Sequence, residues 1–210
     1  MIKVFVSDDH TIVRQGLKQI VADIDDIEVV GEAGSGRETL GLLSKQDCDI
    51  VLLDITMPDK SGIEILKDLK KLRPELKVLM LTMHPEEQYA IRALRAGAYG
   101  YLTKESAPDE LVSAIRKVVS GSRYISEALA IKLADQLVTP AEEPLHQRLS
   151  DREFQIMLMI ASGKKLNEIA NTLFLAKTTI STYRHRVLQK MEMSSNAEIA
   201  RYATENRLLP

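Results

Sequence analysis

The residues best suited to chemistry in this chain are polar side chains that each follow a short apolar run. These groups are Asp8-Asp9, Asp54, Thr82 and Lys104. Three carboxylates crowded in one crevice repel each other, and a hard divalent cation such as Mg²⁺ relieves that repulsion. With the cation bound, one carboxylate can attack an electron-poor phosphorus, while the metal and the ammonium neutralise charge on the transferred group.

The elements that must position these groups alternate along the first 120 residues. Strands are predicted at Ile2–Ser7, Ile27–Val30, Asp49–Leu53, Leu76–Leu81 and Tyr99–Thr103. Helical spacing predicts helices at Thr11–Ala22, Thr39–Leu43, Ile63–Leu72, Glu86–Ala96 and Leu111–Val119. Five strand–helix units with near-continuous apolar strands are typical of a doubly wound parallel sheet covered on both faces. Ligands bind beyond the carboxyl ends of such strands, so we expect the polar groups to share one crevice.

Serine residues with a carboxylate three positions later predict helix starts, because each side chain can satisfy a free backbone N–H. The predicted capping boxes are Ser35…Glu38, Ser61…Glu64, Ser106…Asp109, Ser150…Glu153 and Ser195…Glu198.

Composition bounds the class of protein. The 210 residues are 45% apolar and 28% charged, which is ordinary for a globular chain and argues against disordered and fibrous proteins. No apolar run approaches the ~20 residues of a membrane helix, and the N-terminus lacks a secretory signal pattern. The single cysteine, Cys48, excludes an internal disulfide and a cysteine metal cluster. We therefore expect a cytoplasmic protein without a membrane partner.

The charge is unevenly distributed. Residues 1–120 hold 16 Lys+Arg and 20 Asp+Glu, whereas residues 148–210 hold 10 and 6. An acidic front and a basic back indicate two modules with different partners, although chance variation is the alternative. Between them, residues 121–147 contain one possible helix at Ala128–Leu137, and Thr139–Pro144 then breaks any regular element.

The basic module contains four predicted helices. Two of them, Leu166–Leu173 and Lys177–Met191, have the spacing of a helix-turn-helix, whose second helix enters the major groove of DNA. Hydrogen-bonding and cationic side chains lie on the polar side of the second helix, opposite its apolar stripe. The candidates for DNA contact are Lys177, Thr178, Ser181, Thr182, His185, Arg186 and Lys190, and Gln189 shares that side. A small helical bundle with a polar outer face is the alternative.

The motifs at the strand ends resemble the receiver domain of two-component response regulators. The matching segments are Asp8-Asp9-His10, Asp54–Gly62, Thr82 and Tyr101–Lys104. The resemblance implies that Asp54 is the phosphoacceptor, that Lys104 pairs with the phosphoryl group, and that Thr82 and Tyr101 are switch residues. It also implies Mg²⁺ ligation by Asp9, Asp54 and the Thr56 backbone carbonyl, with Asp8 acting through water. Thr56 and His84 flank the site and, by analogy with the family, tune dephosphorylation; an ordinary solvated position is the alternative for His84.

The basic module resembles the LuxR-type helix-turn-helix, through Leu149–Glu153, Ile169-Ala170, Leu173, Thr179–Thr182 and Val187–Met191. A receiver followed by this module is typical of the NarL/FixJ class, and segments such as Gln155–Ala161 and Thr182–Arg184 look most like its GacA/UvrY branch.

This resemblance implies a five-stranded, flavodoxin-like α/β receiver with strand order 2-1-3-4-5 and a small all-α domain of four helices. We place the receiver at 1–122, a linker with a helix at 123–147 and the DNA-binding domain at 148–210. The expected function is a transcription regulator that takes a phosphoryl group from a sensor histidine kinase and binds double-stranded DNA as a homodimer. The last helix is the family's dimerisation element, while Ile199, Tyr202 and Ala203 on one of its faces equally fit internal packing.

Four positions depart from the family pattern. Glu105 stands where a cis-proline often follows the lysine, and Met83 replaces a small residue, which narrows access for small phosphodonors. Ala176 replaces a capping serine before the recognition helix, and Ser181 replaces a common lysine, which leaves the base preference open.

Two other functions compete with this one. A phosphohydrolase using Asp54 as nucleophile needs a second carboxylate two residues later, and Thr56 stands there instead, so we do not expect a turnover enzyme. A phosphorylation-independent DNA-binding or dimerisation protein would use the receiver only as a scaffold, which the complete acidic set disfavours.

Overall fold

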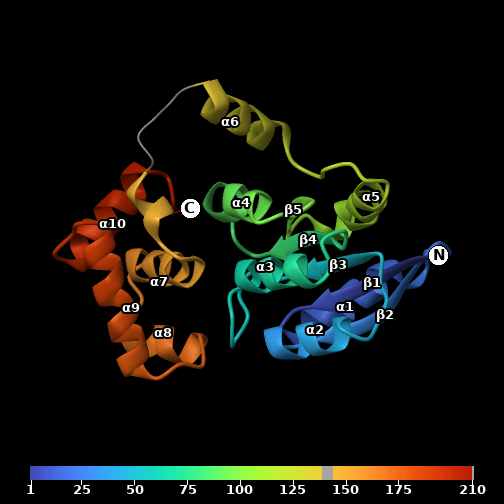
Figure 1. Ribbon diagram of the computed structural model, residues 1–210, viewed down its shortest axis with the longest axis horizontal. Helices are drawn as coiled ribbons and strands as arrows, with labels where there is room; N and C mark the ends of the chain where they lie inside the picture. Colours follow the sequence, from blue (N-terminus) through green and yellow to red (C-terminus); the bar gives the residue numbers. More distant parts are fainter. Residues whose placement is uncertain (139–143, 210) are drawn as a thin grey trace. The chain divides into compact units, whose positions relative to one another are not determined.

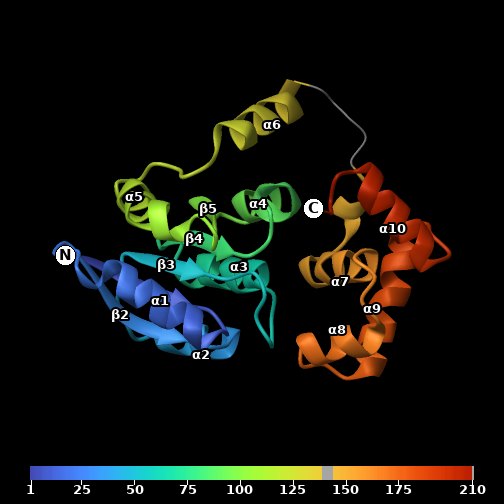
Figure 2. The ribbon, with the colours of Figure 1, turned by 180° about the vertical axis from the view of Figure 1, so that it is seen from behind.

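The computed structural model describes residues 1–138 and 144–209. The chain divides into two compact units, Met1–Leu133 and Ala134–Pro210, and each is described separately below. The predicted boundaries at 122 and 148 stay a prediction, and the predicted break at 139–144 lies outside the described residues except for Pro144. Figures 1 and 2 show the first unit as one sheet flanked by helices and the second as a group of helices.

The first unit contains a five-stranded parallel sheet in the order β2-β1-β3-β4-β5, which confirms the predicted topology. The strands are β1 (Ile2–Ser7), β2 (Ile27–Ala33), β3 (Ile50–Leu53), β4 (Lys77–Thr82) and β5 (Gly100–Thr103). The register pairs Ser7 with Leu53 and Thr82 with Thr103, so neighbouring strands end at the same level. The residues that follow these strands therefore meet at one edge of the sheet.

Five helices cover the sheet, of which the first four connect consecutive strands and the fifth follows the last strand. They are α1 (Thr11–Ala22), α2 (Gly36–Leu43), α3 (Gly62–Leu72), α4 (Glu86–Arg95) and α5 (Ala107–Val119). Helices α1 and α5 contact each other on one side, while α3 contacts both α2 and α4. A further helix, α6 (Glu127–Val138), confirms the helix predicted near residues 128–137.

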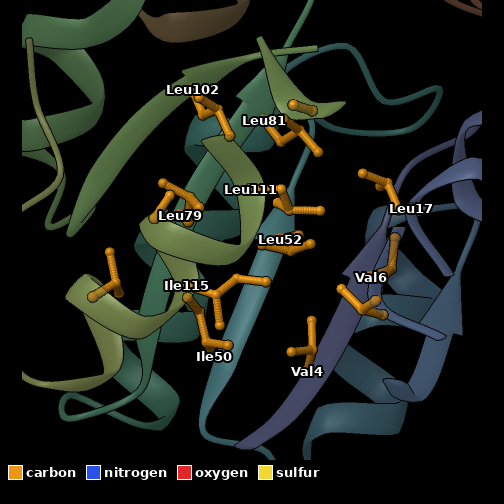
Figure 3. Close-up of a cluster of buried hydrophobic side chains, with 14 of the residues drawn as sticks. Val4, Val6, Leu17, Ile50, Leu52, Leu79, Leu81, Leu102, Leu111 and Ile115 are labelled. Atoms are coloured by element: carbon orange, nitrogen blue, oxygen red, sulfur yellow. The ribbon is translucent and has the colours of Figure 1, made fainter. Parts of the chain in front are cut away.

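The core under α1 and α5 is apolar and closely packed. Figure 3 shows Val4, Val6, Ile50, Leu52 and Leu79 of the sheet meeting side chains of these two helices. All five are at most 2% exposed. Full burial of such a side chain contributes about 1.5–3 kcal/mol, so this layer fixes the strand ends that carry the polar groups.

The predicted helix caps are only partly confirmed. Ser61 and Ser150 form reciprocal capping boxes with Glu64 and Glu153. The Ser35 and Ser195 hydroxyls accept from the backbone N–H three residues later. The carboxylates of Glu38 and Glu198, however, accept from the N–H groups of Gly34 and Ser194 and not from the backbone of the capping serine. The box predicted at Ser106 is wrong. The Ser106 hydroxyl bonds the Thr103 hydroxyl at 3.0 Å, so it is used within the turn that leads into α5.

The chain beyond α5 returns to the edge of the sheet, which the sequence did not indicate. Tyr124 forms a parallel bridge with Gly100: its N–H donates to the Tyr99 carbonyl at 2.9 Å, and its carbonyl accepts from the Tyr101 N–H at 3.0 Å. A Cβ at Gly100 would lie 2.6 Å from the Tyr124 carbonyl oxygen, so only glycine permits this approach. The segment around Tyr124 thus covers part of the β5 edge.

The second unit is helical and confirms the four helices predicted for residues 148–210. A 3-10 turn, η1 (Leu145–Arg148), precedes α7 (Asp151–Ala161), α8 (Leu166–Thr172), α9 (Lys177–Lys190) and α10 (Asn196–Glu205). Helix α7 packs against α9 and α10, and buried Phe154, Ile180 and Ile199 belong to these three helices. Among the helices in the described ranges, none combines the length and apolar character that a membrane crossing requires.

Candidate functional site

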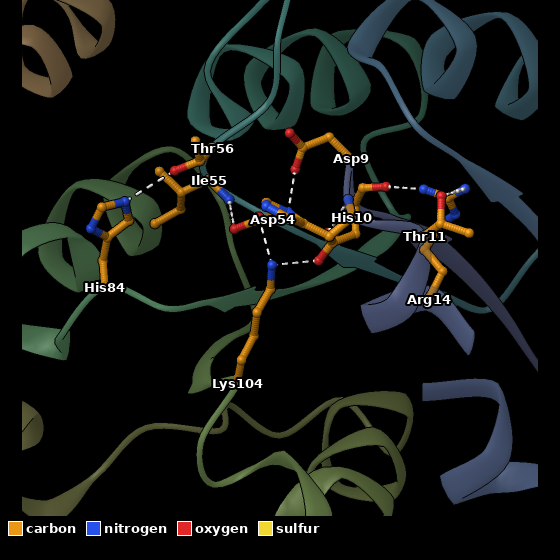
Figure 4. Close-up of polar contacts among 10 residues, drawn as sticks. Asp9, His10, Thr11, Arg14, Asp54, Ile55, Thr56, His84 and Lys104 are labelled. Atoms are coloured by element: carbon orange, nitrogen blue, oxygen red, sulfur yellow. Dashed lines mark hydrogen bonds and ion pairs between the residues drawn. The ribbon is translucent and has the colours of Figure 1, made fainter. Parts of the chain in front are cut away.

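The predicted carboxylates come together beyond the ends of β1 and β3. One ligand atom from each of Asp8, Asp9, His10 and Asp54 lies within 4.8 Å of every other. Asp8 and Asp54 are 2% and 3% exposed, and Asp9 is half-buried. Figure 4 shows Asp9 and Asp54 beside His10 and Lys104. The register described above brings these groups together across 46 residues of sequence.

Lys104 holds two of these carboxylates together. Its Nζ lies 2.5 Å from Asp8 Oδ2 and 2.7 Å from Asp54 Oδ2. Burial raises the pKa of the Asp54 carboxyl, and it stays raised although the nearby Lys104 charge acts in the opposite direction. Burial alone would lower the pKa of Lys104, but the two carboxylates outweigh burial and raise it. One ammonium therefore serves two buried carboxylates, and negative charge is left over at the site.

Hydrogen bonds and a close approach of α3 fix the backbone around Asp54. Its N–H donates to the Ser7 carbonyl at 2.9 Å, and its Oδ1 accepts from the Ile55 N–H at 2.6 Å. Gly62, the first residue of α3, donates its N–H to the Ile55 carbonyl at 2.7 Å. A Cβ at Gly62 would lie 1.9 Å from the Asp54 carbonyl oxygen, so α3 begins directly against the site.

The donor set fits a hard cation. Asp8 Oδ2 and Asp9 Oδ1 are buried, and within the described residues neither accepts a hydrogen bond of good geometry. Nitrogen atoms lie near both, since His10 Nδ1 is 2.7 Å from Asp9 Oδ1 and Lys104 Nζ is 2.5 Å from Asp8 Oδ2. Crowded carboxylate oxygens with spare lone pairs are the ligands that Mg²⁺ prefers. His10 belongs to a motif singled out in the sequence, but its contacts with both aspartates were not predicted.

The predicted switch residues lie next to this cluster. Thr82 is fully buried, and its Oγ1 accepts weakly from the His84 N–H at 3.4 Å. Tyr101 is 3% exposed and donates its hydroxyl to the His84 carbonyl at 2.9 Å. The His84 ring nitrogen Nε2 lies 3.0 Å from Thr56 Oγ1. His84 therefore joins the loop after Asp54 to the switch tyrosine, which argues against the simple solvated position considered for it.

Glu105 and Met83, two of the positions that depart from the family pattern, lie in the loops that follow β5 and β4. The Lys104–Glu105 peptide bond is trans, as are all peptide bonds in the described ranges. Met83 is 72% exposed and borders a cavity that Pro85, Glu86, Thr103 and Glu105 also line. The Met83 side chain extends into solvent next to Thr82 and is not part of the buried core.

The predicted DNA-contacting face of α9 is exposed along its length. The exposed residues are Lys177, Thr178, Ser181, Thr182, His185, Arg186, Gln189 and Lys190. Ile180 and Val187 on the other side are fully buried. A shallow cavity on the exposed face is lined by Thr178, Thr182 and Arg186, with Thr179 and Tyr183. The helix begins after Ala176 without a side-chain cap, as its sequence predicts.

Lys190 differs from the other members of this face. Its Nζ lies 2.6 Å from Glu153 Oε2, and the Glu153 side chain is 4% exposed. Burial alone would raise the pKa of Glu153, but the hydrogen bonds from Lys190 and Ser150 outweigh it and lower that pKa. Lys190 thus ties the end of α9 to the start of α7. Its predicted contact with DNA stays a prediction.

The predicted face of α10 packs inside its own unit. Ile199 and Ala203 are fully buried. The Tyr202 hydroxyl lies 2.9 Å from His146 Nδ1, which ties α10 to the turn before α7. These contacts favour the packing interpretation for this face, and the predicted dimerisation by α10 would have to use its other side.

Two family models match the chain in the units described above. The model of the response regulator receiver domain matches residues 4–116, more than half of the chain. The chain belongs to the response regulators. The model of bacterial regulatory proteins of the luxR family matches residues 147–203. This response regulator therefore carries a receiver domain followed by a LuxR-type DNA-binding domain, which is the composition of a transcription regulator.

Two relatives match this chain along nearly their whole length. The response regulator is 40% identical to UvrY of Escherichia coli K12 over 209 residues, covering 99% of this chain and 96% of that protein. It is 39% identical to GacA of Pseudomonas aeruginosa over 210 residues, covering 100% and 98%. These matches confirm the predicted likeness to the GacA/UvrY branch.

A solved structure shows the same fold. RcsB of Salmonella enterica serovar Typhimurium, bound to the promoter rprA in the presence of the phosphomimetic BeF3⁻, is 26% identical to this response regulator. The similarity covers 97% of this chain and 99% of the RcsB chain, with a TM-score of 0.65.

Proposed function

We propose that Asp54 accepts a phosphoryl group from a sensor histidine kinase and that this modification controls DNA binding. The observation that carries the proposal is the meeting of Asp8, Asp9 and Asp54 in a receiver domain, with Lys104 in contact with Asp8 and Asp54. Asp54 lies at the end of β3, with its carboxylate held by the Ile55 N–H and the Lys104 ammonium. The carboxylate is thereby oriented for attack on an incoming phosphorus.

We infer that the site takes Mg²⁺, because its oxygen donors fit that ion. Asp9, Asp54 and the Thr56 carbonyl would hold it, with Asp8 acting through water. When bound, the ion supplies positive charge that offsets the charge of the three carboxylates and of the phosphoryl oxygens.

The protein's own residues carry the remaining steps. An Asp54 carboxylate oxygen forms the new bond to phosphorus as the phosphorus–nitrogen bond to the kinase histidine breaks. Lys104 leaves its place between the carboxylates for the phosphoryl oxygens, which it can pair with at the same distance. Thr82 then turns toward the phosphoryl group, and Tyr101 gives up its bond to the His84 carbonyl. The loss of that bond frees the start of α4 to move.

The product is a signalling state, and its decay is slow. Rapid hydrolysis of an aspartyl phosphate uses an acid–base carboxylate near the nucleophile, and Thr56 occupies the position two residues after Asp54. The Thr56 hydroxyl is also engaged with His84. We therefore expect self-phosphorylation from small donors and slow self-dephosphorylation, without turnover of an external phosphoester.

The second unit would read double-stranded DNA through the exposed face of α9, with two copies on adjacent half-sites as a homodimer. The proposed domain limits are 1–122 for the receiver, 123–147 for the linker and 148–210 for the DNA-binding domain. A regulator that binds chromosomal DNA must share its compartment, so we place it in the cytoplasm.

One experiment tests phosphorylation and DNA binding on the same sample. The protein is treated with acetyl phosphate and Mg²⁺, or with a kinase, and its mass and its affinity for a duplex selected from random DNA are both measured. We expect one added phosphoryl group, mapped to Asp54, together with tighter binding. Asp54→Ala should show neither change. Equal DNA affinity of the untreated protein, the treated protein and treated Asp54→Ala would favour the phosphorylation-independent alternative. A phosphoryl group on another side chain would refute the assignment of Asp54.

Arg186→Ala is expected to weaken specific DNA binding. Arg186 is exposed in the centre of the α9 face, and its guanidinium lies over the Tyr183 ring at 5.9 Å. Loss of one arginine contact to a base costs about 1–3 kcal/mol, or about 5- to 150-fold in affinity. Fluorescence anisotropy with the selected duplex measures the change. Arg201→Ala is the matched control, because Arg201 is 74% exposed on α10 and pairs with Glu205. Equal losses in both variants would show that only total charge matters.

A further inference from the structure

Asp59, in the loop between β3 and α3, is bonded to a helix that lies 22 residues earlier in the chain. Its Oδ1 accepts from the Gly36 N–H and its Oδ2 from the Arg37 N–H, each at 2.8 Å. These are the first two amides of α2, and the third, that of Glu38, donates to Ser35 Oγ. Burial would raise the pKa of Asp59, but the backbone donors outweigh it and lower that pKa. The carboxylate therefore binds the helix in its charged form.

This contact fixes the centre of the loop that follows Asp54. The loop is held at its ends by the Asp54 N–H on the Ser7 carbonyl and by the Gly62 N–H on the Ile55 carbonyl. Thr56, whose carbonyl is a proposed metal ligand, lies between these points. The local helix cap is already provided by Ser35. Asp59 is therefore not needed to start α2, and its effect is to connect the loop to the helix.

Helix α2 also contacts the other segment that carries metal ligands. Thr39 of α2 is fully buried, and its Oγ1 lies 2.6 Å from Ser7 Oγ, the last residue of β1 before Asp8. The start of the helix packs closely against α3, because a Cβ at Gly36 would lie 2.7 Å from the Ile65 side chain. Helix α2 is thus a common support for the end of β1 and for the loop after Asp54.

We infer that Asp59 is a positioning residue for the proposed Mg²⁺ site, because it links the Thr56 loop through α2 to the strand end that carries Asp8 and Asp9. The inference rests on the proposed function, since it requires that the site binds Mg²⁺. The ion tolerates little departure from octahedral geometry, so ligands on two separate segments must keep their spacing. Residues that orient metal ligands from outside the coordination shell typically change metal affinity about 10- to 100-fold when they are replaced.

The test is calorimetric titration of the full chain with MgCl2. We expect Asp59→Ala to raise the Mg²⁺ Kd about tenfold. Asp59→Asn, which keeps one acceptor oxygen, should fall between Asp59→Ala and the wild type. Asp68→Ala is the matched control: it removes the same charge from nearby α3, where Asp68 pairs with Lys60 at 2.7 Å, and it should leave Kd nearly unchanged. If all three variants weaken binding equally, the effect is long-range charge and the inference is wrong.

A second readout separates positioning from damage to the fold. At saturating Mg²⁺, Asp59→Ala should incorporate phosphoryl groups on Asp54 at the wild-type rate, because the ion compensates for the weaker site. A rate that stays low would indicate a structural defect and overturn the inference. If the wild type binds Mg²⁺ but Asp59→Ala binds it equally well, the inference alone fails. If the wild type binds no Mg²⁺, the proposed function fails as well.

Discussion

Gly62→Ala is expected to destabilise the receiver unit by about 3 kcal/mol or more. The added Cβ would lie 1.9 Å from the Asp54 carbonyl oxygen and 2.8 Å from the Ile55 Cα. All these neighbours are backbone atoms, which cannot turn aside as a flexible side chain does. The start of α3 must therefore move away from the site, and the Gly62–Ile55 hydrogen bond and the Ser61 cap are strained with it.

Gly16→Ala is the control for this substitution. Gly16 lies inside α1, and beyond the local backbone of that helix no heavy atom of the described residues lies within 4 Å of a Cβ placed there. Because alanine has the higher helix propensity, this variant should gain about 0.5–1 kcal/mol. Thermal unfolding followed by calorimetry measures both variants in the transition of the receiver unit. A Gly62→Ala variant as stable as Gly16→Ala would show that α3 does not sit against Asp54 as described.

The sequence was sufficient to predict how the acidic cluster assembles. Apolar strands separated by amphipathic helices allow few arrangements, and parallel strands bring Asp8, Asp54, Thr82 and Lys104 to one edge. The resemblance to receiver domains then supplied the strand order that the spacing alone left open. Residues at strand ends are predictable because the end of each apolar run shows where its strand ends, and parallel strands end at the same edge of the sheet.

Contacts made by loops were not predictable in the same way. The bridge between Tyr124 and Gly100 is formed by backbone groups, which every residue has, so no pattern of side chains predicts it. The Asp59 contact with α2 depends on where two loops meet, and an Asp in a loop has many local partners. Ser106 had the right spacing for a capping box, but its hydroxyl bonds the nearer Thr103 hydroxyl and not a backbone N–H of α5. Spacing identifies candidate partners, and the tertiary fold selects among them.

Asp54→Asn is expected to make the metal-free receiver more stable than the wild type by about 1–2 kcal/mol. In the wild type, the Lys104 ammonium lies between two carboxylates that are almost fully buried. The substitution removes one charge and leaves Lys104 paired with Asp8 alone. Burial also raises the pKa of Asp54 in the folded state, so its contribution to stability is full at low pH and is lost as the pH rises through that pKa. The gain from the variant should therefore grow with rising pH and vanish in acid.

Mg²⁺ should reverse this order. A cation bound only by the folded protein adds about 2.7 kcal/mol of stability at 100 times its Kd. Asp54→Asn removes a proposed ligand and should gain much less. The measurement is the unfolding free energy of the receiver in both proteins, with EDTA and with MgCl2. If the variant is the less stable in EDTA, the carboxylates do not repel as described; if Mg²⁺ stabilises both proteins equally, Asp54 is not a ligand. The carboxylate charge that destabilises the receiver in EDTA is the same charge that would bind the ion and attack phosphorus. A receiver that keeps Asp54 for this function should therefore be less stable in EDTA than the variant that lacks its charge.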